Sequence, residues 1–192
     1  MNPLAPCALV AVLGVSACQA SAATPRAGTL AAARLDAYAN VARRIYSSER
    51  GGAAVRSSLR RIARDRAAMA GDRAELLRQL FLPRYHVVRL RYARGGRVVD
   101  VGGRFVVAGM TRGPLTISMQ DVIGYVKLVH RQTGVGVVVR GRAGHVAASR
   151  KSLASATLPD SGSVTIGDRT YLVKEFTEPG FAGERLRVWL LD

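Results

Sequence analysis

The sequence predicts an α+β fold in which long N-terminal helices precede a domain built on a single antiparallel sheet of about five to seven strands. Two observations support this class. In residues 28–82 apolar side chains recur every three or four positions, as on one face of a helix, whereas in residues 83–192 they mostly alternate with polar ones, as in half-buried strands. The strand-like stretches follow one another across glycine turns, which favours antiparallel pairing.

The chain begins with a segment that is typical of exported proteins. Residues 1–25 contain no charged side chain, although charged residues make up 22% of the chain. Within this segment, residues 4–17 form an apolar run as long as a signal-peptide core and too short to span a bilayer. The run ends at Val15-Ser16-Ala17-Cys18, which resembles a bacterial lipobox. We therefore expect residues 1–17 to be a signal peptide and Cys18 to carry a lipid.

Two alternatives to lipidation stay open. Cleavage within the small-residue stretch 20–22 would release a soluble secreted protein, and a cytoplasmic protein could instead bury Cys18. Lipidation gives a role to Cys18, which would be the one cysteine left after cleavage, because Cys7 lies inside the apolar run. The absence of Lys and Arg before that run argues against it. No later stretch approaches 18 apolar residues, so we expect an extracytoplasmic protein anchored to the membrane by its lipid.

Three helices are expected after a short tether, residues 18–27. The first carries an apolar stripe at Leu35, Tyr38, Ala42 and Ile45 and is interrupted by a glycine pair at 51–52. A second stripe consists of Val55, Leu59 and Ile62. A third helix begins at Asp72, with Glu75 three residues later in a capping-box arrangement, and ends before Pro83. We expect these helices to be a scaffold.

The remaining residues predict a run of short strands with one helix between them. Glycine pairs or single glycines mark most of the turns, and Gly134 marks the end of the helix, residues 121–132. The expected strands are residues 87–92, 97–101, 105–108, 115–119, 135–140, 145–148, 164–166, 170–176 and 186–191.

Three stretches in this order resemble the extracytoplasmic Cache domains, PAS-like sensor modules of bacterial receptors. The first is the glycine-turned hairpin of residues 88–100, which runs on to Gly102-Gly103. The second is the strand-to-helix segment Ser-Met-Gln-Asp-Val-Ile-Gly-Tyr of residues 118–125. The third is the closing pair, with Gly-Asp-Arg-Thr-Tyr at 167–171 and a leucine-rich last strand. The resemblance covers residues 28–192, with the sensor domain itself at 83–192.

The resemblance implies a small-molecule pocket between the sheet and the loops above it. Arg104, Arg112 and Lys127 flank the segment where such pockets form, so they could hold an anionic ligand, such as a carboxylate, by charge-assisted hydrogen bonds. Asp121 is expected to cap the helix, and Tyr125, one turn later, to form the pocket wall. No output domain follows the last strand, so we expect a ligand-binding lipoprotein that signals, if at all, through a partner such as a membrane receptor.

The chain shows no catalytic or metal-binding pattern. Its three histidines, at 86, 130 and 145, have no metal-ligand spacing, and no Gly-x-Ser-x-Gly motif is present. We therefore expect no enzyme, no metal and no cofactor.

The net charge of +16 is spread along the chain without a basic run interleaved with aromatic residues, so nucleic acid is not an expected partner. The charge would instead attract anionic lipid or wall polymer. The alternative function is accordingly a basic, envelope-associated structural protein.

Overall fold

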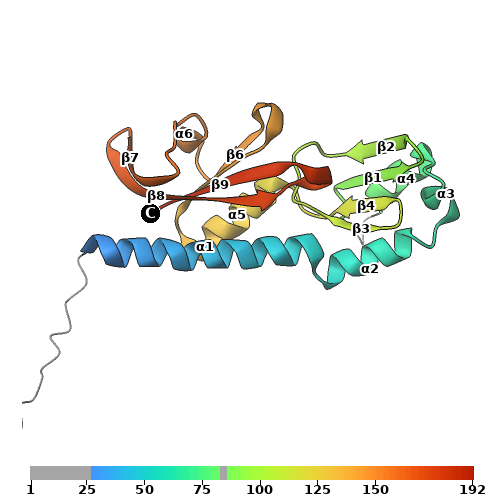
Figure 1. Ribbon diagram of the computed structural model, residues 1–192, viewed down its shortest axis with the longest axis horizontal. Helices are drawn as coiled ribbons and strands as arrows, with labels where there is room; N and C mark the ends of the chain where they lie inside the picture. Colours follow the sequence, from blue (N-terminus) through green and yellow to red (C-terminus); the bar gives the residue numbers. More distant parts are fainter. Residues whose placement is uncertain (1–26, 83–85) are drawn as a thin grey trace, which may run out of the picture.

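A computed structural model describes residues 27–82 and 86–192, so the predicted signal peptide and Cys18 lie outside the described residues. The first part is helical, with α1 at Ala27–Gly51, α2 at Ala53–Ile62, α3 at Arg66–Met69 and α4 at Arg73–Leu80. Helix α1 runs beneath a five-stranded sheet, and α2 continues beneath a four-stranded sheet (Figure 1). No helix in the described ranges is both long enough and apolar enough to cross a membrane.

Within residues 27–82 and 86–192, nine strands form two antiparallel sheets, so the predicted α+β class is confirmed, whereas the predicted single sheet is wrong. The four-stranded sheet has the order β2-β1-β4-β3, and the five-stranded sheet has the order β6-β5-β9-β8-β7. The strands of the first are β1 Arg89–Arg94, β2 Arg97–Gly102, β3 Met110–Arg112 and β4 Leu115–Ser118. Those of the second are β5 Gly136–Arg140, β6 Val146–Ala148, β7 Ser161–Ile166, β8 Arg169–Pro179 and β9 Arg185–Leu191.

The split between the sheets falls where helix α5, Val122–Thr133, leaves β4 and leads to β5. Among the described strands, β4 pairs with β1 and β3, whereas β5 pairs with β6 and β9. Alternating polarity shows which residues form strands but not which distant strands pair, so the two sheets could not be separated from the pattern. The strand expected at 105–108 contributes only isolated bridges, from Val106 and Val107.

Helix ends follow local sequence signals. The Asp72 carboxylate accepts a hydrogen bond from the Glu75 amide at 3.0 Å, as the predicted N-cap requires. The reciprocal half of the capping box does not form, because the Glu75 carboxylate binds the Arg78 guanidinium instead. Gly52 starts α2 with an extended backbone, and a Cβ at this position would lie 2.5 Å from the Ser48 carbonyl oxygen. A glycine is therefore needed where α1 gives way to α2.

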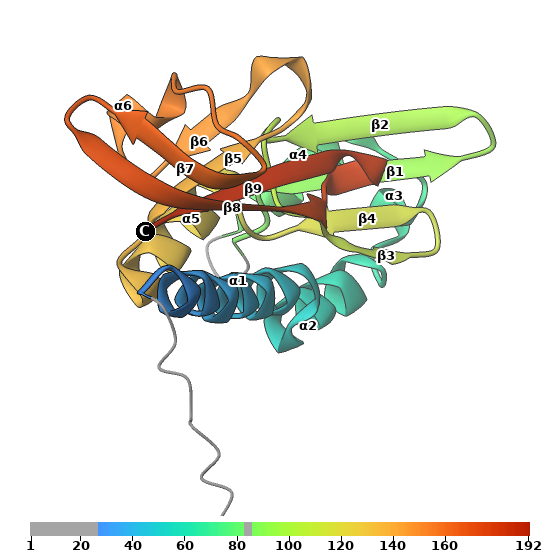
Figure 2. The same cartoon turned by 60° about the vertical axis from the view of Figure 1, so that its left-hand side comes forward.

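Three apolar clusters form the core. The first lies between α1, α5 and the five-stranded sheet, the second lies between α2–α4 and the four-stranded sheet, and the third lies on the other face of the five-stranded sheet, around Trp189 and Leu153. The short helix α6, Lys151–Ala154, contributes Leu153 to the third cluster. Each sheet therefore has its own helical cover and its own core (Figure 2).

Tyr46 of α1 connects the two sheets. Its side chain is 1% exposed, and its hydroxyl donates a hydrogen bond to the carbonyl of Pro179, at the end of β8. The same hydroxyl accepts a hydrogen bond from the amide of Ala108 at 2.9 Å, two residues before β3. Burial raises the pKa of Tyr46 to about 12, so the hydroxyl keeps its proton for this bridge.

Candidate anion-binding groove

A hollow of about 280 Å³ lies between α2 and β3, the outer strand of the four-stranded sheet. The two elements pack against each other, as both views show (Figures 1 and 2). Three of the side chains that line the hollow are arginines, two from the helix and one from the strand. The lining residues are Arg56, Leu59, Arg60, Met110, Thr111 and Arg112.

The helical spacing of α2 explains how it presents charge to this hollow. Val55, Leu59 and Ile62 are buried against the sheet, so the helix has one apolar face. Arg56 and Arg60 are four residues apart and therefore share a different, exposed side of the helix. The sequence thus places Arg56 and Arg60 one helical turn apart on the side of α2 that borders β3.

The third arginine is held by the β3–β4 hairpin. Met110, Thr111 and Arg112 pair with Ile117, Thr116 and Leu115 across it. The Thr111 and Thr116 hydroxyls lie 2.9 Å apart and form a hydrogen bond that fixes the register of the pair. Arg112 is the last residue before the turn and is exposed, so its guanidinium is available at the rim of the hollow.

A second hollow of about 500 Å³ adjoins the first, because Met110 and Thr111 line both. Its other lining residues are Ser47, Arg50, Gly51 and Gly109. Gly109 is essential to this geometry, since a Cβ there would lie 1.5 Å from the Ile117 carbonyl oxygen. The two hollows, which we call the arginine groove, extend from the end of α1 along α2.

The lining of the arginine groove contains four arginines and no acidic side chain. Arg56 donates one hydrogen bond to the Gly51 carbonyl at 2.5 Å, which ties α2 to the end of α1. Within the described part of the chain, Arg60 and Arg112 form no ion pair. A guanidinium presents a planar fork of N–H donors that matches carboxylate and phosphate oxygens. The groove is therefore suited to an anion.

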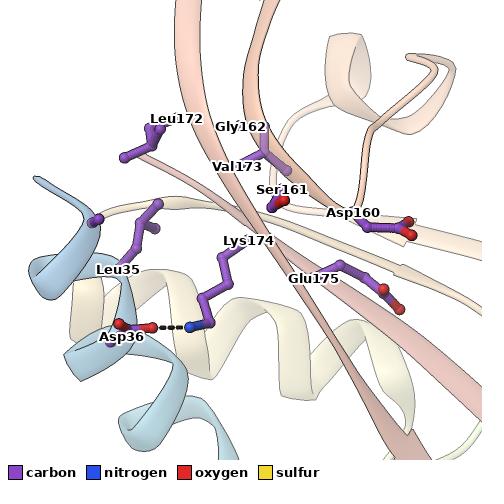
Figure 3. Close-up of a pocket in the computed structure, with 10 residues that line it drawn as sticks. Leu35, Asp36, Asp160, Ser161, Gly162, Leu172, Val173, Lys174 and Glu175 are labelled. Atoms are coloured by element: carbon purple, nitrogen blue, oxygen red, sulfur yellow. Dashed lines mark ion pairs between the residues drawn. The ribbon is translucent and has the colours of Figure 1, made fainter. Parts of the chain in front are cut away.

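A hollow of different character lies on the five-stranded sheet (Figure 3). It has a volume of about 260 Å³ and lies between α1 and the β7–β8 hairpin. Its acidic residues are Asp36, Asp160 and Glu175, and each of them is paired. Asp36 binds Lys174 across the hollow, and Asp160 and Glu175 both bind Arg187. Each carboxylate of this hollow therefore already has a cationic partner, although Asp160 and Glu175 share one.

The structure does not bring the five predicted ligand residues together. Arg112 lines the arginine groove, but Arg104 lines a separate hollow of about 350 Å³ beside Arg73 and Arg89. Lys127 is exposed on α5. Residues 120–125 line none of these four hollows.

Asp121 and Tyr125 have structural roles. The Asp121 carboxylate accepts a hydrogen bond from the Gly124 amide, which confirms the predicted N-cap of α5. Tyr125 is fully buried, its ring lies edge-on to Tyr46 with centroids 5.3 Å apart, and its hydroxyl donates to the Ala42 carbonyl at 3.3 Å. Burial raises the pKa of Tyr125 well above its ordinary value. This tyrosine belongs to the core between α1 and α5.

Sequence reasoning missed Arg50, Arg56 and Arg60. Their spacing was visible, but arginines on the polar side of a helix are usually solvated, so the signal was ambiguous. What distinguishes Arg56 and Arg60 is the position of β3 beside α2, which no local pattern in the sequence shows.

The described residues contain no cluster of three or more His, Cys, Asp or Glu side chains that could hold a metal ion. Two of the histidines make identified contacts: His130 lies 2.7 Å from the Val135 carbonyl oxygen, and the His145 ring stacks on Phe105. Comparison of the chain with models of protein families, with curated proteins and with solved structures finds no match.

Proposed function

We propose that this chain is a non-catalytic, extracytoplasmic binding protein for a small anionic molecule, which it holds in the arginine groove. The observation that carries the proposal is the set of four arginines around two adjoining hollows without an acidic neighbour in the lining. Signalling, where it occurs, would pass to a partner such as a membrane receptor. A Cache-like origin for the domain belongs to the same proposal and rests on the stretches at residues 88–100, 118–125 and 167–171.

A thermal-shift titration tests this function. Succinate and inorganic phosphate, each compared with sodium chloride at equal ionic strength, should raise the melting temperature of the wild type. A ligand at 100 times its Kd stabilises the folded state by about 2.7 kcal/mol. Substituting Arg56→Gln and Arg60→Gln together should abolish the shift, because it removes two of the three guanidinium groups of the smaller hollow.

The matched control replaces two arginines outside the groove, Arg131 on α5 and Arg169 on β8 of the five-stranded sheet. Arg131 and Arg169 are exposed, and in the described ranges neither forms an ion pair, so Arg131→Gln with Arg169→Gln removes the same charge from a different place. The control should keep the full shift. An equal loss in both double variants would mean that overall charge attracts the anion, as in a basic, envelope-associated structural protein that adheres to anionic lipid or wall polymer.

The proposed location is the outer face of the cell membrane, with a lipid on Cys18 as the anchor. This part of the proposal rests on the lipobox-like stretch at residues 15–18. Cys18→Ser should release the protein into the soluble fraction after a high-salt wash, which removes electrostatic attachment. Continued sedimentation of the serine variant with membranes after that wash would show that another feature holds it there.

A further inference from the structure

The arginine groove has an apolar floor although its rim is charged. Leu59 is 3% exposed, and its side chain lies at the base of the smaller hollow. Met110 is half-buried, packs against the core of the four-stranded sheet and forms a wall of both hollows. The methylene stems of arginine side chains add further apolar surface around a guanidinium. An inorganic anion would contact the guanidinium groups alone and would leave the exposed part of the Met110 side chain in water.

The size of the groove also exceeds what a carboxylate group needs. The two adjoining hollows measure about 280 and 500 Å³; the larger is within the range of pockets that hold small organic molecules, about 300–1,000 Å³, and the smaller is just below it. Three arginines surround the smaller hollow, and one arginine borders the larger hollow. The charged end of a ligand is therefore best placed among Arg56, Arg60 and Arg112, and its body can extend past Met110.

We infer that the groove selects an amphipathic organic anion. The carboxylate or phosphate head accepts hydrogen bonds from Arg56, Arg60 and Arg112, and a hydrocarbon portion lies on Leu59 and Met110. This inference rests on the proposed function, because it names the class of anion that the same groove takes. It adds that hydrocarbon contact, as well as charge, determines affinity.

The test is a calorimetric titration of the full chain with acetate, butanoate, hexanoate and octanoate at constant ionic strength. Each methylene that enters the groove should tighten the Kd about fourfold, which corresponds to about 0.8 kcal/mol. Arg56→Gln combined with Arg112→Gln should weaken binding of octanoate more than tenfold. A heptyl trimethylammonium ion, with the same alkyl chain as octanoate and the opposite charge, should not bind.

A variant of the floor separates the hydrocarbon contact from the charge. Met110→Gln keeps the length of the side chain but makes it polar, so it should flatten the dependence of Kd on chain length and leave acetate binding unchanged. Met69→Gln is the matched control, since Met69 is a half-buried methionine of the same core cluster that does not line the groove. The control should keep the wild-type dependence.

The results distinguish this inference from the proposed function. Arginine-dependent binding with the same Kd for all four acids would overturn the inference that the ligand is amphipathic, and the proposed anion binding would stand. Binding of all four acids that does not depend on the groove arginines would overturn both this inference and the proposed function.

Free acids and lipid headgroups share this chemistry, and vesicles separate them. Binding to phosphatidylglycerol vesicles, but not to phosphatidylcholine vesicles or to monomeric octanoate, would assign the anion to a membrane lipid. Binding of octanoate without binding of vesicles would assign it to a free acid. In either case the Arg56→Gln, Arg112→Gln variant should lose the interaction. Binding of neither probe would contradict the inference.

Discussion

The two regions of the molecule differ in charge. Residues 53–118 form helices α2–α4 and the four-stranded sheet, and they contain 14 basic and 4 acidic residues. Residues 122–192 form α5 and the five-stranded sheet, and they contain 10 basic and 6 acidic residues. The net charges are therefore +10 and +4. The hollow of the five-stranded sheet has three carboxylates in its lining, all paired with Lys174 or Arg187. In the groove beside the four-stranded sheet, Arg60 and Arg112 form no ion pair with any described residue.

This difference shows that the net charge of a region does not reveal which of its charged side chains are paired. Arginines become available to a ligand where acidic residues are scarce, and exposed pairs such as Arg187 with Asp160 neutralise one another at little gain in stability. The arginine groove therefore combines four arginines with no acidic side chain in its lining.

The largest expected effect comes from breaking the connection between the two sheets. Tyr46→Phe removes the hydroxyl that bonds both Ala108 and Pro179, and leaves a buried amide and a carbonyl without a partner. We expect a loss of about 1–3 kcal/mol in the free energy of unfolding, measured by urea denaturation. The control is Tyr38→Phe, because Tyr38 is a half-buried tyrosine on the same helix. An equal loss of stability in the two variants would rule out the hydrogen bonds of Tyr46 as the cause.

A smaller loss is expected at the start of α5, beside the five-stranded sheet. Asp121→Ala removes the acceptor of the Gly124 amide and should cost about 0.5–2 kcal/mol of stability. Octanoate binding should stay unchanged, because Asp121 does not line the arginine groove. Weaker anion binding in this variant, measured by titration calorimetry, would move the ligand site toward α5.

The hydroxyl of Tyr125 should matter for stability and not for binding. Tyr125→Phe loses one long hydrogen bond to the Ala42 carbonyl, so we expect a loss of about 0.5–1.5 kcal/mol in urea denaturation. The sequence instead predicts that Tyr125 forms the wall of a ligand pocket. A phenylalanine variant with wild-type stability and weakened anion binding would restore that earlier interpretation.

The two regions should also respond differently to pH. Hydrogen bonds from Arg78 lower the pKa of Glu75, on α4, to about 2, whereas burial raises the pKa of Glu178, on β8, above 4.5. A lowered pKa adds stability that is present above pH 4.5 and is lost as the pH falls toward 2. A raised pKa reduces stability as the pH rises from 4.5 through the folded pKa of Glu178.

Urea denaturation between pH 2 and pH 7 checks both signs. Glu75→Gln should destabilise the protein at pH 7, and the difference from the wild type should disappear toward pH 2. Glu178→Gln should stabilise it at pH 7, and this gain should disappear at and below pH 4.5. A destabilised Glu178→Gln variant at pH 7 would mean that the carboxylate of Glu178 makes a favourable interaction that outweighs its burial.

Features set by neighbouring residues could be predicted from the sequence. Asp72 and Asp121 cap their helices, and Gly134 ends α5 with a positive φ of 75°. The turn at Gly95-Gly96 sets the β1–β2 register, in which Arg94 pairs with Arg97. Such features depend on hydrogen bonds between residues two to five positions apart, so the local sequence contains all the necessary information.

Features that depend on distant contacts could not be predicted. The division into two sheets follows from which distant strands pair, β4 with β1 and β3, and β5 with β6 and β9. Tyr125 was assigned to a pocket because a buried tyrosine and a pocket-lining tyrosine have the same helical spacing. Of the predicted ligand residues, Arg112 alone lies in the arginine groove. Its partners Arg56 and Arg60 precede it by about fifty residues, and only the packing of α2 on β3 makes them neighbours.

The most direct test of the central claim is an NMR titration that follows the arginine side-chain Nε–Hε resonances during addition of octanoate. The account predicts saturable shifts of Arg56, Arg60 and Arg112 at a common Kd, with Arg131 and Arg169 unchanged at constant ionic strength. Small shifts of similar size across arginines of both sheets, without saturation, would show that octanoate responds to the overall charge and would contradict the existence of a binding groove.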